Sequence, residues 1–461
     1  MTTIDERDTG VALPGEAPYE EATRVFNLVA PARPAAAVTV RTVEDIRAAL
    51  RLATVERMPV RVHTTGHASA TARPMDGALL IRTRMAGAVE IDPVRRLARV
   101  PAGTSWGEVV AASSAHGLIP PHGSSPDVGV VGYLLRGGMS FYSRRAGLAV
   151  NSVRAVELVT ADGEWRRVDA ATDPELFWAL RGGGGGFGVV TAVEVELFPV
   201  ARVVTGAAFW PAEHAPALLR AWRRWTEDAP WEAATSARVM NLPPLPDVPP
   251  VLAAGPMLCV DGVVLAADED AVPAALAQAE DLLGPLRAVA EPVMDTFELT
   301  TPAMVLQAHM DPSDPVPIVG DHMLLGEIGD DGVAELLRVI GPGSGSPLVV
   351  AGLRQLGGAY AVADPAGGVL SHFDARFAYS GAGVPEGGLT REAILAHCAT
   401  VREALAPFDT GRTAPTFVER FDQPQGHLTA DQVVAVDRVR ARVDPAGLFR
   451  QDTMRSTTAL I

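Results

Sequence analysis

The chain of 461 residues contains no lysine, so arginine supplies all 39 of its basic side chains. Together with abundant alanine, glycine and proline, this bias is typical of translation from a GC-rich bacterial genome. Cysteine is scarce too, with only Cys259 and Cys398 present. The two could pair, but in a chain without a secretion signal we expect free buried thiols. No spacing of cysteine and histidine resembles a zinc site, so we expect no metal centre.

An excess of positive charge and long apolar runs are also missing. The 55 acidic residues give a net charge of −16, which argues against nucleic acid or an anionic membrane as the main partner. No apolar run is long enough to span a bilayer. The segment Met1 to Gly10 has four charged residues and no apolar core, unlike a signal peptide. We therefore expect a cytoplasmic monomer or homodimer, long enough for two or three domains.

Two glycine-rich stretches carry most of the information. In the first, a short strand from Val60 to Val62 enters a polar loop that ends at His67. The second runs from His122 to Gly147 and has too many glycines for a regular helix and too few charges for a solvated linker. Small residues let backbone N–H groups approach an anion closely. Two such loops in one domain predict a large phosphate-bearing ligand.

Helix and strand signals alternate on both sides of these loops. Thr42 is placed to cap a helix with one apolar face, Ser105 opens a capping box, and Asp173-Pro174 begins a further helix. A strand is expected at Gly77 to Ile81. Beyond residue 200 the pattern changes to a sheet with helices on one side. Further helices are predicted there at 211–228, 268–283, 330–340, 390–405 and 431–443. The fold class is α+β.

An ordered set of blocks identifies a resemblance. The blocks are the loop ending in Gly66-His67, Gly123 to Gly129 with Arg136-Gly137-Gly138, Val156 to Gly163, Leu180 to Thr191, and Val443 to Arg450. In this order they resemble the flavin-binding half of the vanillyl-alcohol-oxidase superfamily, and within it the berberine-bridge-enzyme-like oxidases. They cover most of residues 38–200 and the tail, whereas the middle of the chain matches poorly.

The resemblance implies a domain plan. An N-terminal arm (1–36) would precede a two-lobed FAD-binding domain of the PCMH type (37–205). A substrate-binding domain with an antiparallel sheet covered by helices (206–418) would follow, and residues 419–461 would return to the FAD-binding domain. The cofactor residues that it implies are His63, Thr64, Thr65, Gly66, His67, Ala68, Gly123, Ser124, Ser125, Val128, Gly129, Gly132, Tyr133, Gly138, Gly188 and Val190.

Members of this family often attach the flavin 8α-methyl group to a histidine at the position of His67. A neutral imidazole nitrogen is a suitable nucleophile for that bond, so we expect covalent FAD. The alternative is a loop histidine hydrogen-bonded to the backbone. Members with two covalent links have a cysteine at the position of Ser125. A serine cannot form that thioether, so we expect no second link.

The resemblance also implies a reaction. An FAD-dependent oxidase would remove hydride from a C–H bond next to oxygen or nitrogen of a small secondary metabolite, a base would take the proton, and O₂ would reoxidise the flavin. The Asn-Tyr pair of the family, whose tyrosine often serves as base, aligns with Gln432-Val433. The usual base is then absent. Tyr142 and Tyr379 are the catalytic candidates, and Tyr360 and Gln432 are the substrate candidates, with packing as the alternative for each. The histidines that could replace the base are His309, His322 and His372.

Other readings of the glycine runs fit less well. Gly182 to Gly188 follows a helix and precedes a strand, the reverse of a dinucleotide-binding fingerprint. No G-x-S-x-G occurs, so a nucleophile elbow is missing. Two rivals keep the flavin: a non-redox cyclase or isomerase that uses it as a scaffold, and a carrier without catalysis. Anaerobic reduction of the flavin by a substrate would favour the oxidase.

Overall fold

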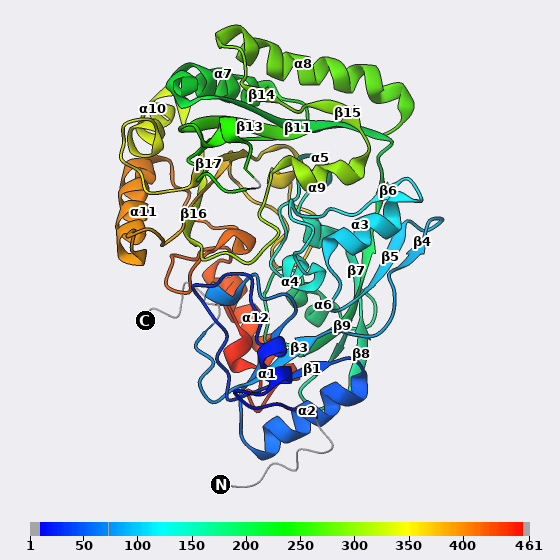
Figure 1. The fold of residues 1–461 in the computed structure, drawn as a ribbon. Helices are drawn as coiled ribbons and strands as arrows, with labels where there is room; N and C mark the ends of the chain where they lie inside the picture. The colour runs from blue at the N-terminus through cyan, green and yellow to red at the C-terminus, as the bar shows by residue number, and fades with distance from the viewer. Residues whose placement is uncertain (1–9, 72, 247, 455–461) are drawn as a thin grey trace.

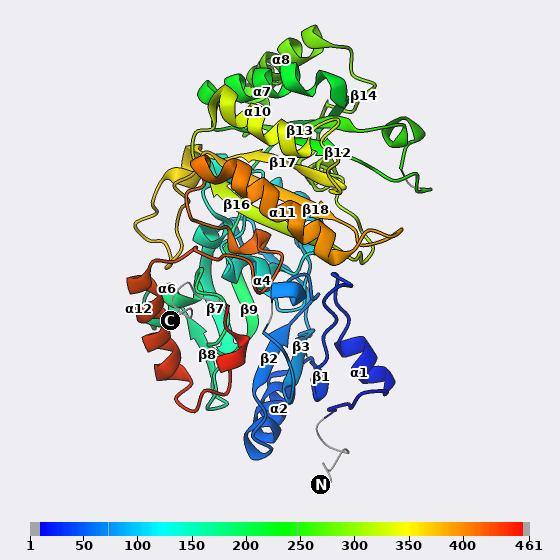
Figure 2. The same cartoon turned by 90° about the vertical axis from the view of Figure 1, so that its left-hand side faces the viewer.

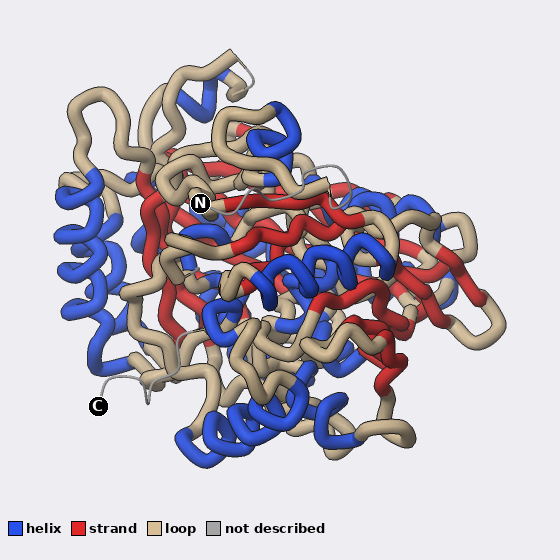
Figure 3. Tube along the Cα trace, turned by 90° about the horizontal axis from the view of Figure 1, so that it is seen from below, coloured by secondary structure: helices blue, strands red, loops and turns tan. Residues whose placement is uncertain are grey.

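The computed structural model describes residues 10–71, 73–246 and 248–454, which form two lobes (Figure 1). The expectation for the first ten residues lies almost wholly outside the described part. The lower lobe in Figure 1 contains the N-terminal elements, and the upper lobe contains the large sheet. The view from below (Figure 3) shows helices along the outer edges of the molecule, with strands between them.

A small parallel sheet begins the lower lobe. Its strands, in the order β1-β3-β2, are β1 (Ala36–Val40), β3 (Leu79–Thr83) and β2 (Val60–His63). The helices beside it are α1 (Ala17–Ala22) and α2 (Val43–Val55). The predicted cap of α2 is confirmed, because the Thr42 side chain accepts a hydrogen bond from the Asp45 amide within a capping box. The apolar face of α2 is buried against the strands, as its spacing predicts.

An antiparallel sheet completes the lower lobe. Its strands, in spatial order, are β4 (Glu90–Asp92), β5 (Leu97–Pro101), β9 (Val189–Glu196), β7 (Val153–Val159) and β8 (Trp165–Val168). The short strands β6 (Leu118–Ile119) and β10 (Phe198–Pro199) pair beside it. The helices α3 (Trp106–Ser114) and α6 (Pro174–Leu180) begin at the predicted caps, Ser105 and Asp173.

The second glycine-rich stretch corrects one expectation. It contains two short helices, α4 (Val130–Leu135) and α5 (Ser143–Ala146), where no regular helix was predicted. The glycine inside α4, Gly132, costs about 1 kcal/mol relative to alanine. Burial of Val130 and Leu134 offsets that cost. Gly137 and Gly138 have φ of 95° and 71°, so they end α4 in a conformation that other residues avoid.

The upper lobe is an eight-stranded antiparallel sheet. Its path is β14-β11-β13-β12-β17-β18-β16, with β15 paired to β11. The strands are β11 (Arg202–Pro211), β12 (Ala233–Met240), β13 (Met257–Ala266), β14 (Met294–Asp295), β15 (Glu298–Thr300), β16 (Val319–Leu325), β17 (Val350–Gln355) and β18 (Phe377–Gly383). The inner face of this sheet points toward the lower lobe (Figures 1 and 2).

Helices cover the outer face of the large sheet (Figure 2). They are α7 (Ala215–Asp228), α8 (Val272–Val289), α10 (Gly329–Ile340) and α11 (Arg391–Leu405), and the short α9 (Val305–Ala308) packs on β11 and β13. The predicted α+β class and the helix-covered antiparallel sheet are confirmed. Cys259 and Cys398 are free and buried, as expected. Within the described part of the chain, no helix is both long and apolar enough to cross a membrane.

The C-terminal helix α12 (Ala430–Val443) packs on α6 in the lower lobe. Arg442 donates to both carboxylate oxygens of Asp173, at 2.9 and 3.0 Å. Further along, the Asp452 carboxylate accepts a hydrogen bond from the Val62 amide at 3.0 Å. Arg440 donates to the carbonyls of Gly183 and Gly185. These contacts tie the end of the described chain to the loops of the lower lobe.

Candidate functional site

A cavity of about 420 Å³ lies between the glycine-rich loops and the inner face of the large sheet. The structure brings together on it all the sequence-predicted cofactor residues except Gly138: His63, Thr64, Thr65, Gly66, His67, Ala68, Gly123, Ser124, Ser125, Val128, Gly129, Gly132, Tyr133, Gly188 and Val190. A Cβ atom on Gly138 would lie 2.4 Å from the Tyr133 ring. Gly138 therefore permits close packing behind the cavity wall.

The end of the first loop presents His67 to the cavity. Its ring stacks on Phe26, with centroids 4.1 Å apart and planes inclined by 16°. Burial lowers the pKa of His67 to about 4, although the charge of Asp127 acts in the opposite direction. The imidazole is therefore neutral at pH 7. The preceding Gly66 has φ of +74°, and a Cβ there would lie 2.7 Å from the Val25 Cα, so only glycine fits.

Some of the neighbouring polar side chains of the loops already have hydrogen-bond partners within the protein. His63 is also neutral, because burial lowers its pKa to about 4, and its Nε2 lies 2.7 Å from the Ala22 carbonyl. Ser124 donates to an Asp311 oxygen at 2.5 Å, which links the second loop to the segment after α9. Ser125 is buried on the cavity wall. Of these, only His67 combines a neutral nucleophilic nitrogen with the expected place in the loop.

Unpartnered polar atoms test whether the cavity fits FAD. Ser69 Oγ, Tyr133 OH, Thr416 Oγ1 and Arg354 Nη2 are buried without a hydrogen-bond partner among the described residues, and all four residues line the cavity. Each such atom costs about 1–3 kcal/mol when it stays unsatisfied. A ligand rich in donors and acceptors relieves that cost. FAD has ring carbonyls, ribityl hydroxyls and phosphates, so the residues fit it.

The catalytic tyrosines predicted from the sequence do not reach this cavity in the described structure. Tyr142 is fully buried, and its hydroxyl donates to the Pro302 carbonyl at 3.2 Å. Tyr379 is buried in the core beneath the helices of the upper lobe. Burial raises the pKa of both phenols above the ordinary value. Their catalytic role stays a prediction that the position of neither side chain supports.

The predicted substrate residues also lie apart from the described cavity wall. Tyr360 is in a 3₁₀ turn, Gly358–Ala361, and not on a strand as its surroundings suggested. Its hydroxyl donates to the Ser140 carbonyl at 2.7 Å. Gln432 completes the capping box of α12 with Thr429 and donates to the Val369 carbonyl at 2.9 Å. Both side chains have structural hydrogen bonds, which matches the packing alternative.

Apart from His309, which was among the candidate histidines, the wall opposite the loops was not predicted from the sequence. It comes from the upper lobe and from the segment before α12, and its residues include His309, Asp311, Ile318, Arg354, Thr416, Phe417, Val418 and Glu419. Burial raises the pKa of Glu419 to about 7. A signal for part of this wall was present in the sequence. Asp261 is the one charged residue in the apolar strand β13, and a buried charge requires partners.

Comparison with known proteins assigns the glycine-rich loops to a known domain family. Residues 34–169 match the family described as FAD binding domain. The chain carries a PCMH-type FAD-binding domain. Over 167 residues it is 34% identical to (R)-6-hydroxynicotine oxidase of Paenarthrobacter nicotinovorans, covering 36% of this chain and 36% of that protein. The chain spans less than half the length of the first curated relatives that it matches.

Solved structures extend the likeness to the whole fold. Wild-type BBE-like 1 of Physcomitrella patens superposes with a TM-score of 0.79 at 18% identity, over 95% of both chains. The 6-hydroxy-D-nicotine oxidase of Arthrobacter nicotinovorans gives 0.80 at 20% identity, over 96% of this chain and 97% of that one. The chain has the berberine-bridge-enzyme-like fold, so the resemblance seen in the sequence is confirmed at the level of domain and fold.

Proposed function

We propose that this protein is an FAD-linked oxidase of a small molecule. The observation that carries the proposal is one cavity lined on one side by the FAD-binding loops and on the other by residues of the upper lobe, among them Arg354 and His309. Bound FAD supplies a hydride acceptor that O₂ reoxidises. The loops hold the cofactor, and the opposite wall binds and orients the substrate.

We further propose that His67 forms the single covalent link to the flavin. Its ring stacks on Phe26, and burial keeps the imidazole neutral, so one ring nitrogen is unprotonated at pH 7. The linkage is tested by denaturing the purified protein in acid and asking where the yellow colour goes. Colour should stay in the protein pellet of the wild type and move to the supernatant for His67→Ala. His116→Ala, which changes an exposed histidine just after the end of α3, is the matched control and should keep the colour in the pellet.

Oxidase activity is tested by anaerobic mixing with a panel of sugars, benzylic alcohols and cyclic secondary amines. At least one probe should bleach the flavin absorbance, and admission of O₂ should restore it with release of hydrogen peroxide. Product formed while the flavin stays oxidised would instead favour the cyclase or isomerase. Binding without either change would favour a carrier and refute the proposal.

A further inference from the structure

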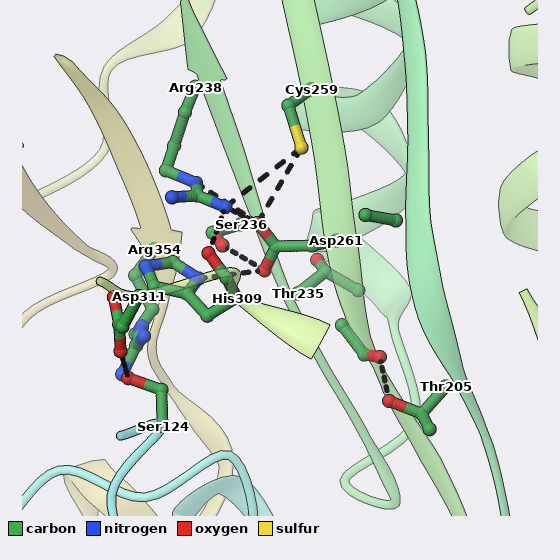
Figure 4. Close-up of polar contacts among 12 residues, drawn as sticks. Ser124, Thr205, Thr235, Ser236, Arg238, Cys259, Asp261, His309, Asp311 and Arg354 are labelled. Carbon is green, nitrogen blue, oxygen red and sulfur yellow. Dashed lines mark hydrogen bonds and ion pairs between the residues drawn. The ribbon is translucent and has the colours of Figure 1, made fainter. Parts of the chain in front are cut away.

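A row of polar side chains crosses the inner face of the large sheet. Ser236 on β12 lies directly opposite Asp261 on β13 and opposite Arg354 on β17 in the strand registers. Arg238 is two residues further along β12, on the same face. Figure 4 shows Ser236, Arg238 and His309 gathered around the Asp261 carboxylate, and Asp311 beside Ser124. This row forms the substrate side of the cavity through Arg354 and His309.

Asp261 is fully buried, and donors surround its carboxylate. Ser236 Oγ donates to Oδ1 at 2.6 Å, and Arg238 Nε donates to Oδ2 at 3.0 Å. His309 Nδ1 lies 3.1 Å from Oδ1. These partners hold the pKa of Asp261 well below its usual range, despite burial. An ionised carboxylate can only accept, so Nδ1 of His309 must carry the proton in this contact.

The consequence for His309 is a fixed tautomer. With the proton on Nδ1, Nε2 of the neutral ring has a free lone pair, and no hydrogen bond to a described residue occupies that nitrogen. Burial and Arg238 lower the pKa of His309, while Asp261 and Asp311 raise it, and the net shift is downward. The guanidinium of Arg354 and the imidazole of His309 both contact the ring of Phe141. The imidazole of His309 is therefore neutral at pH 7 and available as a proton acceptor.

The other two histidines considered from the sequence, His322 and His372, differ from His309 in the partners of the ring nitrogens and in their distance from the cavity wall. His322 is fully buried with both nitrogens engaged, Nδ1 at 2.6 Å from the Tyr379 carbonyl and Nε2 accepting from the Ala414 amide at 3.0 Å. His372 is exposed, and its Nδ1 lies 3.1 Å from the adjacent Ser371 hydroxyl. Among the three, His309 alone pairs with a buried carboxylate and lines the cavity.

Arg354 indicates which substrate the base would serve. Its guanidinium carbon lies 4.5 Å from the Phe141 ring centroid and 5.3 Å from that of Phe417. Its Nη2 is buried and has no hydrogen-bond partner among the residues described. His309 meets the same Phe141 ring edge-on at 5.7 Å between centroids. A fixed positive charge beside the base stabilises a developing alkoxide and repels an ammonium.

We infer that His309 is the catalytic base for oxidation of a hydroxyl-bearing substrate, with Asp261 as its positioning residue and Arg354 as the group that binds the substrate oxygen. The inference rests on the proposed oxidase function. The O–H bond breaks and its proton moves to Nε2 of His309. The loops would hold the flavin as the acceptor for the hydrogen on the adjacent carbon and for both electrons of its C–H bond, and the product would be a carbonyl compound. The imidazolium then returns its proton to water, while Asp261 stays ionised throughout.

The first test compares rates of anaerobic flavin bleaching by the alcohol of the panel that bleaches the wild type fastest. His309→Gln should lower that rate about 100- to 10,000-fold, the usual contribution of a general base, with unchanged flavin content. Added imidazole should partly restore the rate of His309→Ala. His372→Gln is the matched control and should bleach at the wild-type rate. Glu419→Gln tests the other titratable group of this wall, which would be the base if its rate fell while that of His309→Gln did not.

The second test needs no turnover. Nitrogen-15 spectra of histidine-labelled protein should show His309 with Nδ1 protonated and Nε2 bare at pH 7. In Asp261→Asn the pKa of His309 should fall, since a raising charge is lost, and the acid limb of the bleaching rate should move to lower pH. An Nε2-protonated ring in the wild type would overturn the inference.

The outcomes separate the inference from the function on which it rests. Equal bleaching of His309→Gln and wild type, loss of bleaching in Glu419→Gln alone, or bleaching only by amines would overturn the inference and leave the oxidase intact. A wild-type flavin that no probe bleaches would overturn both.

Discussion

Removal of the buried charge at Asp261 should destabilise the upper lobe strongly. The Asp261 side chain is completely buried, and that of its partner Arg238 is 10% exposed. If one charge is removed, water therefore cannot take its place as a partner of the other. Removing one member of such a pair leaves an uncompensated buried charge, at a cost of about 3–5 kcal/mol. Unfolding entropy of about 2.1 cal/mol/K per residue converts this, for a chain of 461 residues, into a fall of about 3–5 °C in Tm.

Differential scanning calorimetry of Asp261→Ala measures this fall directly. The matched control is Glu269→Ala, which removes the partner of Arg202 in a pair with side chains 42% and 69% exposed. Exposed pairs contribute about 0–1 kcal/mol, so the control should change Tm by about 1 °C or less. The double variant Asp261→Leu with Arg238→Met should recover much of the loss, because both charges are gone. Equal shifts for Asp261→Ala and Glu269→Ala would refute this account of the buried row.

Three further predictions follow from the lower lobe and the core. Gly66→Ala should empty the site of flavin, because the left-handed conformation and the 2.7 Å approach to Val25 both exclude a Cβ, and absorbance at the flavin band after purification reports it. Tyr133→Phe should raise the Tm of flavin-free protein and lower flavin affinity, since its hydroxyl is unpartnered until a ligand binds; a flavin titration of both proteins decides this. Burial lowers the pKa of His322 to about 3, so the unfolded chain binds a proton that the folded chain excludes between pH 6.5 and 3. Stability should therefore fall as pH falls through that window, and His322→Gln should show a shallower fall in urea midpoints, where an unchanged slope would contradict the prediction.

Much of the lower lobe could be predicted from the sequence because its helix caps and glycine loops are local sequence signals. The Thr42 cap, the Asp173-Pro174 helix start and the glycine loops all depend on residues within a few positions of one another. Even the capping role of Gln432 could have been predicted, since Thr429 and Gln432 have the spacing of a capping box. It was assigned to the substrate because the resemblance, and not the local pattern, guided the choice.

The substrate wall could not be read in the same way. His309 meets Asp261 across 48 positions, and Asp261 meets Arg238 only through the register of β12 on β13. Register is set by pairing of distant strands, which sequence periodicity does not specify. Tyr142 and Tyr379 were chosen for their chemistry, but a phenol also packs in a core: Tyr142 donates to a carbonyl there, and the Tyr379 hydroxyl has no hydrogen-bond partner among the described residues. Their burial could be known only once the strands were assembled.

The contact between Asp452 and Val62 has a consequence for biosynthesis. Both residues belong to the wall of the FAD cavity, although almost the whole described chain separates them. Domains commonly fold in order as they leave the ribosome. Here the N-terminal loops emerge long before the segment that closes over them. The cofactor therefore meets a complete site only after translation has passed residue 452, which makes loading of the flavin a late event in the maturation of the protein.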